Sequence, residues 1–363
     1  MPKRWDCDRS PSPDEARRRR SGCGAHQMSR RVHVLTQYVW PDDAPTGIYA
    51  EQIADGLAAQ GVPVRLVAGS GKYRPGSRAA PRTEILRLPH RLGRRGRLMS
   101  TAREYLSVHR AFARYLRSQV GRGDTVLITS APPTTVFLHA QVRRRGARAV
   151  YWLQDYYPQL IRGVWDPPRV FVKHLGVLWE NALARWNEVI KSAPNLAYRG
   201  SNARVLRNWN TIDPGEPRPC RSGTALYSGN LGYGHDLGAF IDMCAGLRDR
   251  GYEVTVRGDG PGMSRLPDWI NIEAPLEDPA SLLASYWEAE VHLVAADPRL
   301  QDAIFPSKIW NSLAVGRPIM ASGFAGAMAE ELDYVRQCDF RRHLPEFIEW
   351  LAALHCEEWS DRP

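Results

Sequence analysis

The sequence predicts an α/β fold of two doubly wound, Rossmann-like domains that face a central cleft. Three observations predict it. Short apolar strands alternate with helices, a turn-rich connector at 213–219 divides the chain, and glycine-rich turns follow predicted strands. With 363 residues the chain can form two domains that each bury a core. Open α/β sheets bind ligands at the carboxyl ends of their strands, so these turns are candidate binding segments.

The first half of the chain is expected to contain a tail and one domain. Residues 1–28 include four consecutive arginines without apolar periodicity, which predicts a disordered basic tail. An N-terminal domain is expected over 29–212. Its strands are predicted near 32–36, 63–68, 84–88, 125–129, 148–153 and 203–207, and its helices over 47–60, 98–117 and 170–192.

The second half repeats this alternation after a linker over 213–222. A domain is expected over 223–340, with strands near 224–228, 252–256, 291–295 and 318–322. Between the last two strands, a helix begins at Pro306-Ser307-Lys308 and ends at Gly316, where glycine commonly terminates a helix. The C-terminal segment 341–363 contains a predicted helix over 344–354, which could pack back on the first domain.

The composition predicts a cytoplasmic globular protein. Hydrophobic residues make up 43% and charged residues 24% of the chain. No apolar run approaches the roughly 20 residues that span a bilayer, and the start lacks the apolar core of a secretory signal. The six cysteines show no spacing typical of a disulfide framework or a zinc site.

The net charge of +10 is concentrated in one segment. Residues 72–122 hold 14 Lys or Arg against Glu84 and Glu104. On the helix over 98–117, an arginine face is expected opposite an apolar side, with further arginines just before the helix. The predicted membrane or acceptor face consists of Arg94, Arg95, Arg97, Arg103, Arg110, Arg114 and Arg117. It suits anionic lipid head groups or a lipid diphosphate, which predicts peripheral attachment to the inner face of a membrane. The alternative is a merely solvated charged face.

Three turns of the second domain could hold a phosphate group. They are Gly229-Asn230-Leu231-Gly232, Gly258-Asp259-Gly260-Pro261 and Pro306-Ser307-Lys308. Free N–H groups at a helix start attract anions, and Lys308 adds a full positive charge. The alternative for Lys308 is a solvated lysine.

The order of these motifs resembles the sugar-nucleotide domain of family 4 glycosyltransferases, which are retaining enzymes of the GT-B fold. The resemblance covers roughly residues 30 to 325. Further motifs resemble the branch that builds exopolysaccharides and O-antigens: Pro45-Thr46-Gly47, Thr129-Ser130-Ala131-Pro132-Pro133, Gln154-Asp155-Tyr156-Tyr157-Pro158 and Asn208-Trp209.

The resemblance implies a nucleotide-diphosphate sugar as donor and no need for a metal or other cofactor. It assigns donor binding to Thr46, Gly47, Gly229, Asn230, Gly232, Gly258, Asp259, Pro306, Ser307, Lys308 and Asn311. Catalysis is expected from Lys308, Asp155 and His235. Lys308 would stabilise the departing diphosphate. Asp155 could orient the acceptor hydroxyl or take its proton, or it could simply cap a helix. His235 could partly replace a cation that the family often carries after its glycine-rich turn.

One departure from the family weakens this transfer of roles. The family carries two glutamates separated by seven residues, and here Ala303 and Asn311 occupy these positions. The second glutamate commonly binds the ribose. Asn311 could do so more weakly, because an amide both donates and accepts.

Two functions remain open, and a third is disfavoured. The first is transfer of a sugar to a lipid-linked or other anionic acceptor during the synthesis of cell-surface polysaccharide. The second is a non-catalytic, nucleotide-sugar-binding partner subunit, which the changes at Ala303 and Asn311 would suit. Nucleic acid is not expected as a partner, because no helix-turn-helix, zinc or RNA-binding signature occurs.

Overall fold

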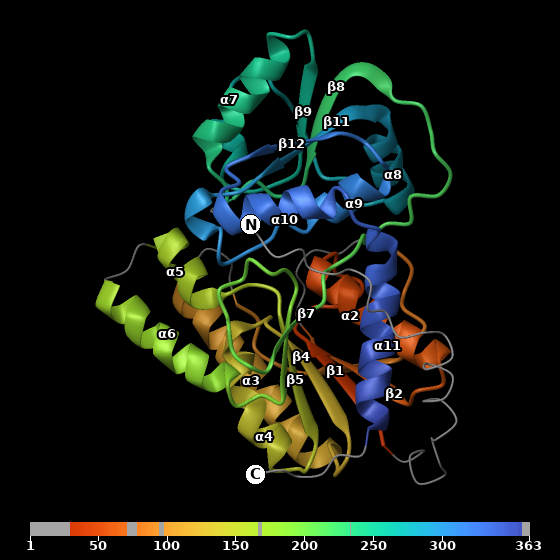
Figure 1. The fold of residues 1–363 in the computed structure, drawn as a ribbon, viewed down its shortest axis with the longest axis vertical. Helices are drawn as coiled ribbons and strands as arrows, with labels where there is room; N and C mark the ends of the chain where they lie inside the picture. Colours follow the sequence, from red (N-terminus) through yellow and green to blue (C-terminus); the bar gives the residue numbers. More distant parts are fainter. Residues whose placement is uncertain (1–29, 71–77, 94–97, 166–168, 233, 358–363) are drawn as a thin grey trace, which may run out of the picture.

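The computed structural model describes residues 30–70, 78–93, 98–165, 169–232 and 234–357 of the chain. The predicted tail over 1–28 and the arginines Arg94, Arg95 and Arg97 lie outside this part. The described strands form two separate sheets, each with its own domain (Figure 1). The predicted fold class, two Rossmann-like α/β domains, is confirmed.

The N-terminal sheet, in the described part of the chain, has the strand order β3-β2-β1-β4-β5-β6-β7 with all neighbours parallel. The strands are β1 (Val32–Thr36), β2 (Val64–Gly69), β3 (Ile85–Leu88), β4 (Thr125–Thr129), β5 (Arg148–Leu153), β6 (Glu188–Lys191) and β7 (Ala203–Val205). The chain starts near the centre and winds outward on both sides, which is the doubly wound order. All carboxyl ends therefore meet at one edge.

Helices cover both faces of this sheet (Figure 1). One face carries α3 (Leu98–Gln119), the 3-10 helix η2 (Pro133–Leu138), α4 (His139–Arg143), α5 (Tyr157–Trp165) and α6 (Arg169–Leu183). The other carries α2 (Pro45–Ala59) and α11 (His343–Cys356). Parallel neighbours need crossover connections, and the helices supply them.

The C-terminal sheet repeats the pattern in the order β10-β9-β8-β11-β12, again all parallel among the described strands. Its strands are β8 (Arg221–Ser228), β9 (Glu253–Arg257), β10 (Asn271–Glu273), β11 (Ala289–Ala295) and β12 (Ile319–Ser322). Its helices are α7 (Leu237–Arg248), η3 (Met263–Arg265), α8 (Pro279–Glu288), η4 (Pro298–Leu300), α9 (Lys308–Ala314), α10 (Gly326–Val335) and η5 (Phe340–Arg342).

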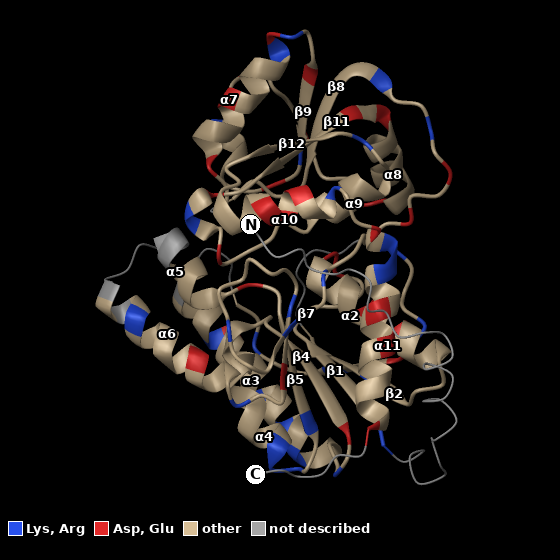
Figure 2. Cartoon of the chain, viewed as in Figure 1, with Lys and Arg blue, Asp and Glu red and all other residues tan. Residues whose placement is uncertain are grey.

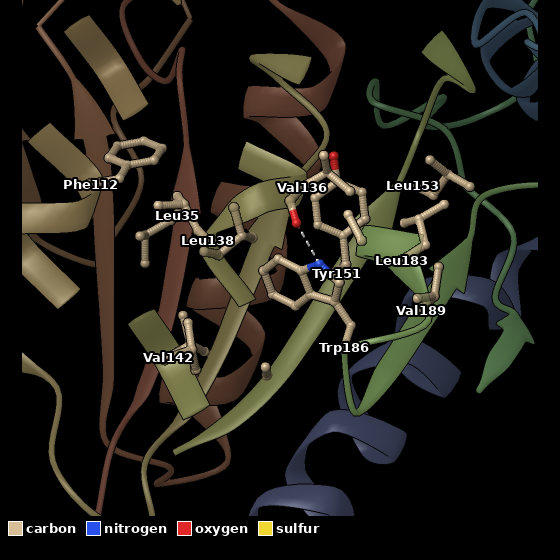
Figure 3. Close-up of a cluster of buried hydrophobic side chains, with 14 of the residues drawn as sticks. Leu35, Phe112, Val136, Leu138, Val142, Tyr151, Leu153, Leu183, Trp186 and Val189 are labelled. Atoms are coloured by element: carbon tan, nitrogen blue, oxygen red, sulfur yellow. Dashed lines mark hydrogen bonds between the residues drawn. The ribbon is translucent and has the colours of Figure 1, made fainter. Parts of the chain in front are cut away.

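The N-terminal core lies on both faces of its sheet because the strand residues alternate. Leu35 and Tyr151 point to the α3 side, whereas Val34 and Trp152 point to the α2 side. On the α3 side, Trp186 donates its indole N–H to the Val136 carbonyl at 2.9 Å (Figure 3). This bond satisfies the polar atom of a large buried ring.

The C-terminal helix α11 packs on the N-terminal domain. Phe347 and Leu351 are fully buried in the same cluster as Trp152. A Cβ on Gly56 of α2 would overlap the end of the Ile348 side chain, so the two helices pack closely at this glycine. The chain thus crosses back from the second domain and ties its end to the first.

The arginine helix packs as the sequence predicts. Val108, Phe112 and Leu116 of α3 are fully buried against the sheet. Arg103, Arg110, Arg114 and Arg117 are exposed on its outer side. The amphipathic pattern is therefore confirmed, while the partner of the arginine face stays a prediction.

Two short strands were predicted wrongly. The expected helix over 170–192 ends at Leu183, and 188–191 forms β6 between β5 and β7. The strand β6 buries Val189 and Ile190 on opposite faces of the sheet, and so short a pattern cannot be distinguished by periodicity from part of a helix. The strand β10 was missed, since three residues at a sheet edge carry too little pattern. Among the described helices, none is long and apolar enough to cross a membrane.

Candidate functional site

The carboxyl edges of the two sheets contact each other through the segments that follow β5, β6 and β11. The backbone N–H of Tyr156 donates to the Ala303 carbonyl at 2.7 Å, and the Asn195 amide donates to the Gln301 carbonyl at 2.7 Å. Asp155 follows β5, and Lys308 lies five residues beyond Ala303. The geometry therefore brings predicted site residues of both domains to one interface.

The two glycine-rich turns of the second domain interlock. The N–H of Gly229 donates to the Arg257 carbonyl at 2.8 Å, and the N–H of Leu231 donates to the Asp259 carbonyl at 2.8 Å. A Cβ on Gly258 would overlap the Gly229 carbonyl, so the backbones could not approach this closely with another residue there. The carboxylate of Asp259 accepts the N–H of Gly260 at 2.6 Å, which stabilises its own turn.

Lys308 lies directly over the first glycine turn. Its Nζ is 3.4 Å from the Asn230 carbonyl and 5.2 Å from the centre of the Tyr227 ring. A Cβ on Gly229 would overlap the Lys308 side chain, so glycine makes room for the lysine. Burial lowers the pKa of Lys308 to about 8. The predicted pairing of Lys308 with the Gly229 turn is thus present in the structure.

The helix that Lys308 begins is short. The helix α9 ends at Ala314, and Ser307 makes no side-chain hydrogen bond to its first turn. A short helix sums few peptide dipoles, so the lysine charge outweighs the dipole as an attraction for an anion. Pro306 and Ser307 lie at the end of the connection that leads into α9.

His235 contacts the same turn through its ring nitrogen Nδ1. The N–H of Gly232 donates to its Nδ1 at 3.0 Å, and the Tyr227 hydroxyl donates to the Asn230 carbonyl at 2.8 Å. His235 Nε2 lies 3.1 Å from the Tyr227 oxygen, and Nδ1 also lies 3.1 Å from the Gly232 carbonyl. Burial, with a contribution from Lys308, lowers the pKa of His235 to about 4, so the ring is neutral at pH 7. A neutral, bonded ring holds the turn but supplies no positive charge.

Asp155 is the unusual ionisable group of the first domain. Its backbone N–H points to the Ser130 hydroxyl at 3.4 Å. Within the described residues its carboxylate has neither a hydrogen bond nor an ion pair, so it does not cap α5. Burial raises the pKa of Asp155 to about 6. A carboxylate with a raised pKa and no partner at the end of a parallel strand is typical of a functional residue.

Glu104 also reaches this edge, and sequence reasoning missed its place. Its carboxylate accepts the Gln37 amide at 3.0 Å and the Tyr38 hydroxyl at 3.4 Å, just after β1. It also accepts the N–H of Gly93 at 3.1 Å. The available signal was that Glu104 is the single acid on an otherwise basic helix, which is typical of a residue that turns inward.

Thr46 and Gly47 lie in the first turn of α2. The N–H of Gly47 donates to the Ala44 carbonyl at 2.9 Å. A Cβ on Gly47 would overlap the Tyr38 carbonyl, so the close approach that requires this glycine is made by the chain's own backbone. A donor contact at Thr46 or Gly47 stays a prediction.

The two positions that depart from the family have definite structural roles. Ala303 is fully buried where the domains touch. The oxygen of the Asn311 amide accepts the N–H of Thr211 at 2.8 Å, and its nitrogen donates to the Thr211 hydroxyl at 3.0 Å. Asn311 therefore joins α9 to the segment just before the linker, and a ribose contact at Asn311 stays a prediction.

Metal ligands do not gather at this interface. In the described part of the chain, no group of three or more His, Cys, Asp and Glu is placed to hold a metal ion. That the reaction needs no metal stays a prediction.

Comparison with known proteins finds glycosyltransferases that resemble this chain in sequence or in fold. No family model matches the chain. A protein of Escherichia coli K12 that is provisionally named a colanic acid biosynthesis glycosyl transferase, WcaI, is 34% identical over 139 residues. The match covers 35% of this chain and 33% of that protein, so the chain spans about a third of the curated relative's length.

Solved structures extend the likeness to most of the chain. The catalytic domain of starch synthase IV from Arabidopsis thaliana, bound to ADP and acarbose, has a TM-score of 0.54 at 11% identity, covering 91% of this chain and 95% of that domain. WaaG, a glycosyltransferase involved in lipopolysaccharide biosynthesis, has a TM-score of 0.52 at 13% identity, with coverage of 90% and 94%. These likenesses show the GT-B fold, and with the WcaI match they confirm the resemblance drawn from the motifs.

A third structure bears on nucleic acid. An α-glucosyltransferase in complex with UDP and a 13-mer DNA has a TM-score of 0.51 at 10% identity, covering 90% of this chain and 94% of that one. A protein of this fold can therefore hold DNA, and the expectation that nucleic acid is no partner has no support from the comparisons.

Proposed function

We propose that the chain is a glycosyltransferase that moves a sugar from a nucleotide-diphosphate donor to a lipid-linked or other anionic acceptor in the synthesis of cell-surface polysaccharide. The observation that carries the proposal is the placement of Lys308 over the Gly229 turn, with Asp155 on the facing edge of the other domain. The first group suits a departing diphosphate and the second suits an acceptor hydroxyl.

The reaction assigns one task to each group. A bond forms between the acceptor oxygen and the anomeric carbon, and the bond from that carbon to the diphosphate oxygen breaks. The electron pair leaves on the diphosphate, where Lys308 offsets the added negative charge. Asp155 takes the acceptor proton. Retention of configuration is proposed on the family resemblance alone, and metal independence on the cation that Lys308 supplies.

Three other residues act through position. His235 holds the turn that receives the diphosphate, Asn311 fixes α9 against Thr211, and Gly258 allows the two turns to interlock. Donor binding would use the backbone around Gly229 and Gly258 together with Ser307 and Lys308. The starch synthase neighbour holds ADP and the α-glucosyltransferase neighbour holds UDP, which supports a nucleoside diphosphate as ligand.

The acceptor is proposed to reach the protein at a membrane. The exposed arginines of α3 suit anionic head groups, so the chain would attach peripherally at the inner, cytoplasmic face. A lipid-linked acceptor would lie in the same plane.

The test begins with donor identity. Each nucleotide sugar is added to the full chain, and the donor is the one that raises the melting temperature, since a ligand of the folded state must stabilise it. That donor is then incubated with membrane lipids, and release of nucleoside diphosphate is measured. Release that depends on the lipid acceptor supports the enzyme. Tight donor binding without release would instead support the alternative, a non-catalytic nucleotide-sugar-binding subunit.

A further inference from the structure

Two carboxylates reach the carboxyl edge of the N-terminal sheet, Asp155 after β5 and Glu104 from α3. The loop after β4 connects their positions. The N–H of Gln37 donates to the Ala131 carbonyl at 3.1 Å, and the N–H of Asp155 points to the Ser130 hydroxyl at 3.4 Å. Glu104 accepts the side-chain amide of Gln37 at 3.0 Å. The strands β1 and β5 stand two places apart in the sheet, so their ends lie about 10 Å apart.

Tyrosines line the edge between these acids. The Tyr38 hydroxyl lies 3.4 Å from Glu104 Oε1. Burial, and after it the nearby Asp155 carboxylate and three other tyrosine hydroxyls that include Tyr38, raise the pKa of Tyr157 well above its ordinary value. The hydroxyl of Tyr157 therefore keeps its proton and can donate. Its ring packs on Trp179 with ring centres 5.9 Å apart, which fixes its position. Tyr38 and Tyr157 are half-buried, so one side of each can contact a ligand.

No positive charge acts on Asp155 from the described residues. Burial raises the pKa of this carboxyl to about 6, and no cation in the described part of the chain lowers it. Lys191, at the end of β6, donates its Nζ to a carbonyl of its own loop at 2.9 Å. On α3, Arg103 and Arg110 are exposed on the outer side, whereas Glu104, the single acid of that helix, turns inward (Figure 2). Because a desolvated anion needs a cation or charge-assisted hydrogen bonds, this edge disfavours a phosphate or a carboxylate.

We infer that this edge selects an acceptor whose reacting end is an uncharged sugar, and that Glu104 is the residue that rejects acidic ones. This inference rests on the proposed function and names the substrate class of the same site. The sugar hydroxyl passes its proton to Asp155 as its oxygen bonds to the anomeric carbon of the donor. Tyr157 donates a hydrogen bond to a neighbouring oxygen of the sugar. Half-buried aromatic rings and a few polar groups are typical of a small-ligand site.

The inference also gives the reaction a place in a sequence of reactions. A bare lipid phosphate would bring its negative charge against Asp155 and Glu104, and like charges brought together at a binding site strongly disfavour the complex. The chain would therefore not begin a glycan on a lipid phosphate. An earlier glycosyl or glycosyl-phosphate transfer has to supply an acceptor that already ends in an uncharged sugar, with the anionic lipid part lying beyond this edge.

The test gives the full chain matched pairs of acceptors, together with the nucleotide sugar that raises its melting temperature. Each pair is an octyl glucoside, galactoside or mannoside and the corresponding octyl uronide, and octyl phosphate serves as the bare phosphate. Release of nucleoside diphosphate gives kcat/KM, and saturation-transfer NMR measures binding without turnover. The variants are Glu104→Gln and Tyr157→Phe. The control is Glu180→Gln, because Glu180 of α6 is also an acid that bonds inward, to the Tyr156 hydroxyl.

The parent should use an uncharged glycoside at least about tenfold better than its uronide, because like charges held close near a protein surface repel by at least that factor. It should not use octyl phosphate. Glu104→Gln keeps the shape of the side chain and removes its charge, so the preference for the uncharged glycoside should fall roughly tenfold. Tyr157→Phe should raise the acceptor KM up to roughly tenfold, the value of one hydrogen bond, and leave donor affinity unchanged. Glu180→Gln should behave as the parent does.

Other results would overturn the inference. A parent that uses a uronide or octyl phosphate as well as the uncharged glycoside, or an unchanged preference in Glu104→Gln, would show that Glu104 does not select the acceptor. Binding of none of the uncharged glycosides would show that this edge is no sugar site.

Failure of the proposed function would look different. A chain that never releases nucleoside diphosphate, yet binds the uncharged glycosides and rejects the uronides until Glu104 is changed to Gln, would keep the sugar site and remove the enzyme. The donor-dependent rise in melting temperature should be the same in all variants, which shows that each of them is folded.

Discussion

Lys308 and Asp155 have pKa values displaced toward neutrality, Lys308 down to about 8 and Asp155 up to about 6, both by burial. The lysine is charged below its pKa, and the aspartate is a base above its pKa. The proposed roles need both groups ionised, so kcat/KM against pH should form a bell with limbs near 6 and 8. Asp155→Asn should remove most of the activity at every pH. If Asp155→Asn keeps high activity and its pH profile keeps the acidic limb, another group is the base.

The raised pKa of Asp155 also has a consequence for stability. Its pKa in the folded chain, about 6, lies above the ordinary value of 3.8, so the folded state binds the proton more tightly. The contribution of Asp155 to the free energy of unfolding therefore falls as the pH rises from about 4 to about 6. Asp155→Asn should raise the melting temperature at pH 7 but not at pH 4. Equal melting temperatures of parent and variant at pH 7 would contradict this.

Gly229 should be required for the position of Lys308. Gly229→Ala places a Cβ where the lysine chain lies, and the positive φ of 141° adds strain. Affinity for nucleoside diphosphate should fall roughly tenfold to a hundredfold, the value of a charge-assisted hydrogen bond. Gly223→Ala is the matched control. It also has a positive φ, of 71°, but an added Cβ would meet only the Gly251 carbonyl, at 3.6 Å. Equal losses in both variants would mean that backbone strain, and not Lys308, sets the affinity.

At the scale of elements, α9 is tied to the segment between the domains by Asn311. Asn311→Ala removes the hydrogen bonds to Thr211 and should lower the free energy of unfolding by about 1–2 kcal/mol. Urea unfolding measures it, with Asn271→Ala as control, because that exposed amide also bonds to side chains. Reduced donor affinity at unchanged stability would show that Asn311 contacts the donor instead.

These elements show where sequence reasoning succeeds. The strands β1, β4, β5 and β11 carry apolar runs bounded by turn residues, and the predicted bounds agree with the structure within a residue or two. The arginine face of α3 could be predicted because its arginines recur at helical spacing in the sequence. The strand β6 is buried on both faces and has no period to recognise, so 188–191 was read as helix.

The candidate site was predictable only in part. Lys308 and Gly229 lie in turns that can be recognised in the sequence. Both turns follow strands of the same parallel sheet, so a contact between them could be expected. The positions of Glu104 and Asn311 could not, because each depends on a partner far along the chain: Gln37 for Glu104, and Thr211 for Asn311. Such pairs are set by tertiary packing, which no local pattern encodes.

At the scale of the whole molecule, two further contacts hold the C-terminal part of the chain on the N-terminal domain. Arg207 bonds to Glu331 through two hydrogen bonds of 2.6 and 3.1 Å, and α11 returns to the first domain beside Asn208, whose carbonyl accepts His343 Nδ1 at 2.8 Å. Both join the segment before the linker to the end of the chain. These contacts therefore help to hold the edge that carries Asp155 against the edge that carries Lys308.

The central claim is that Lys308 stabilises charge that develops as the diphosphate departs. The most direct measurement is kcat and donor Kd for the parent and Lys308→Ala, with the nucleotide sugar that stabilises the parent and a membrane acceptor. The account predicts a kcat lower by roughly ten- to a thousandfold, with a smaller change in donor Kd, because the lysine matters most in the transition state. A parent protein that binds donor without turnover, or equal small effects of Lys308→Ala on binding and kcat, would contradict it.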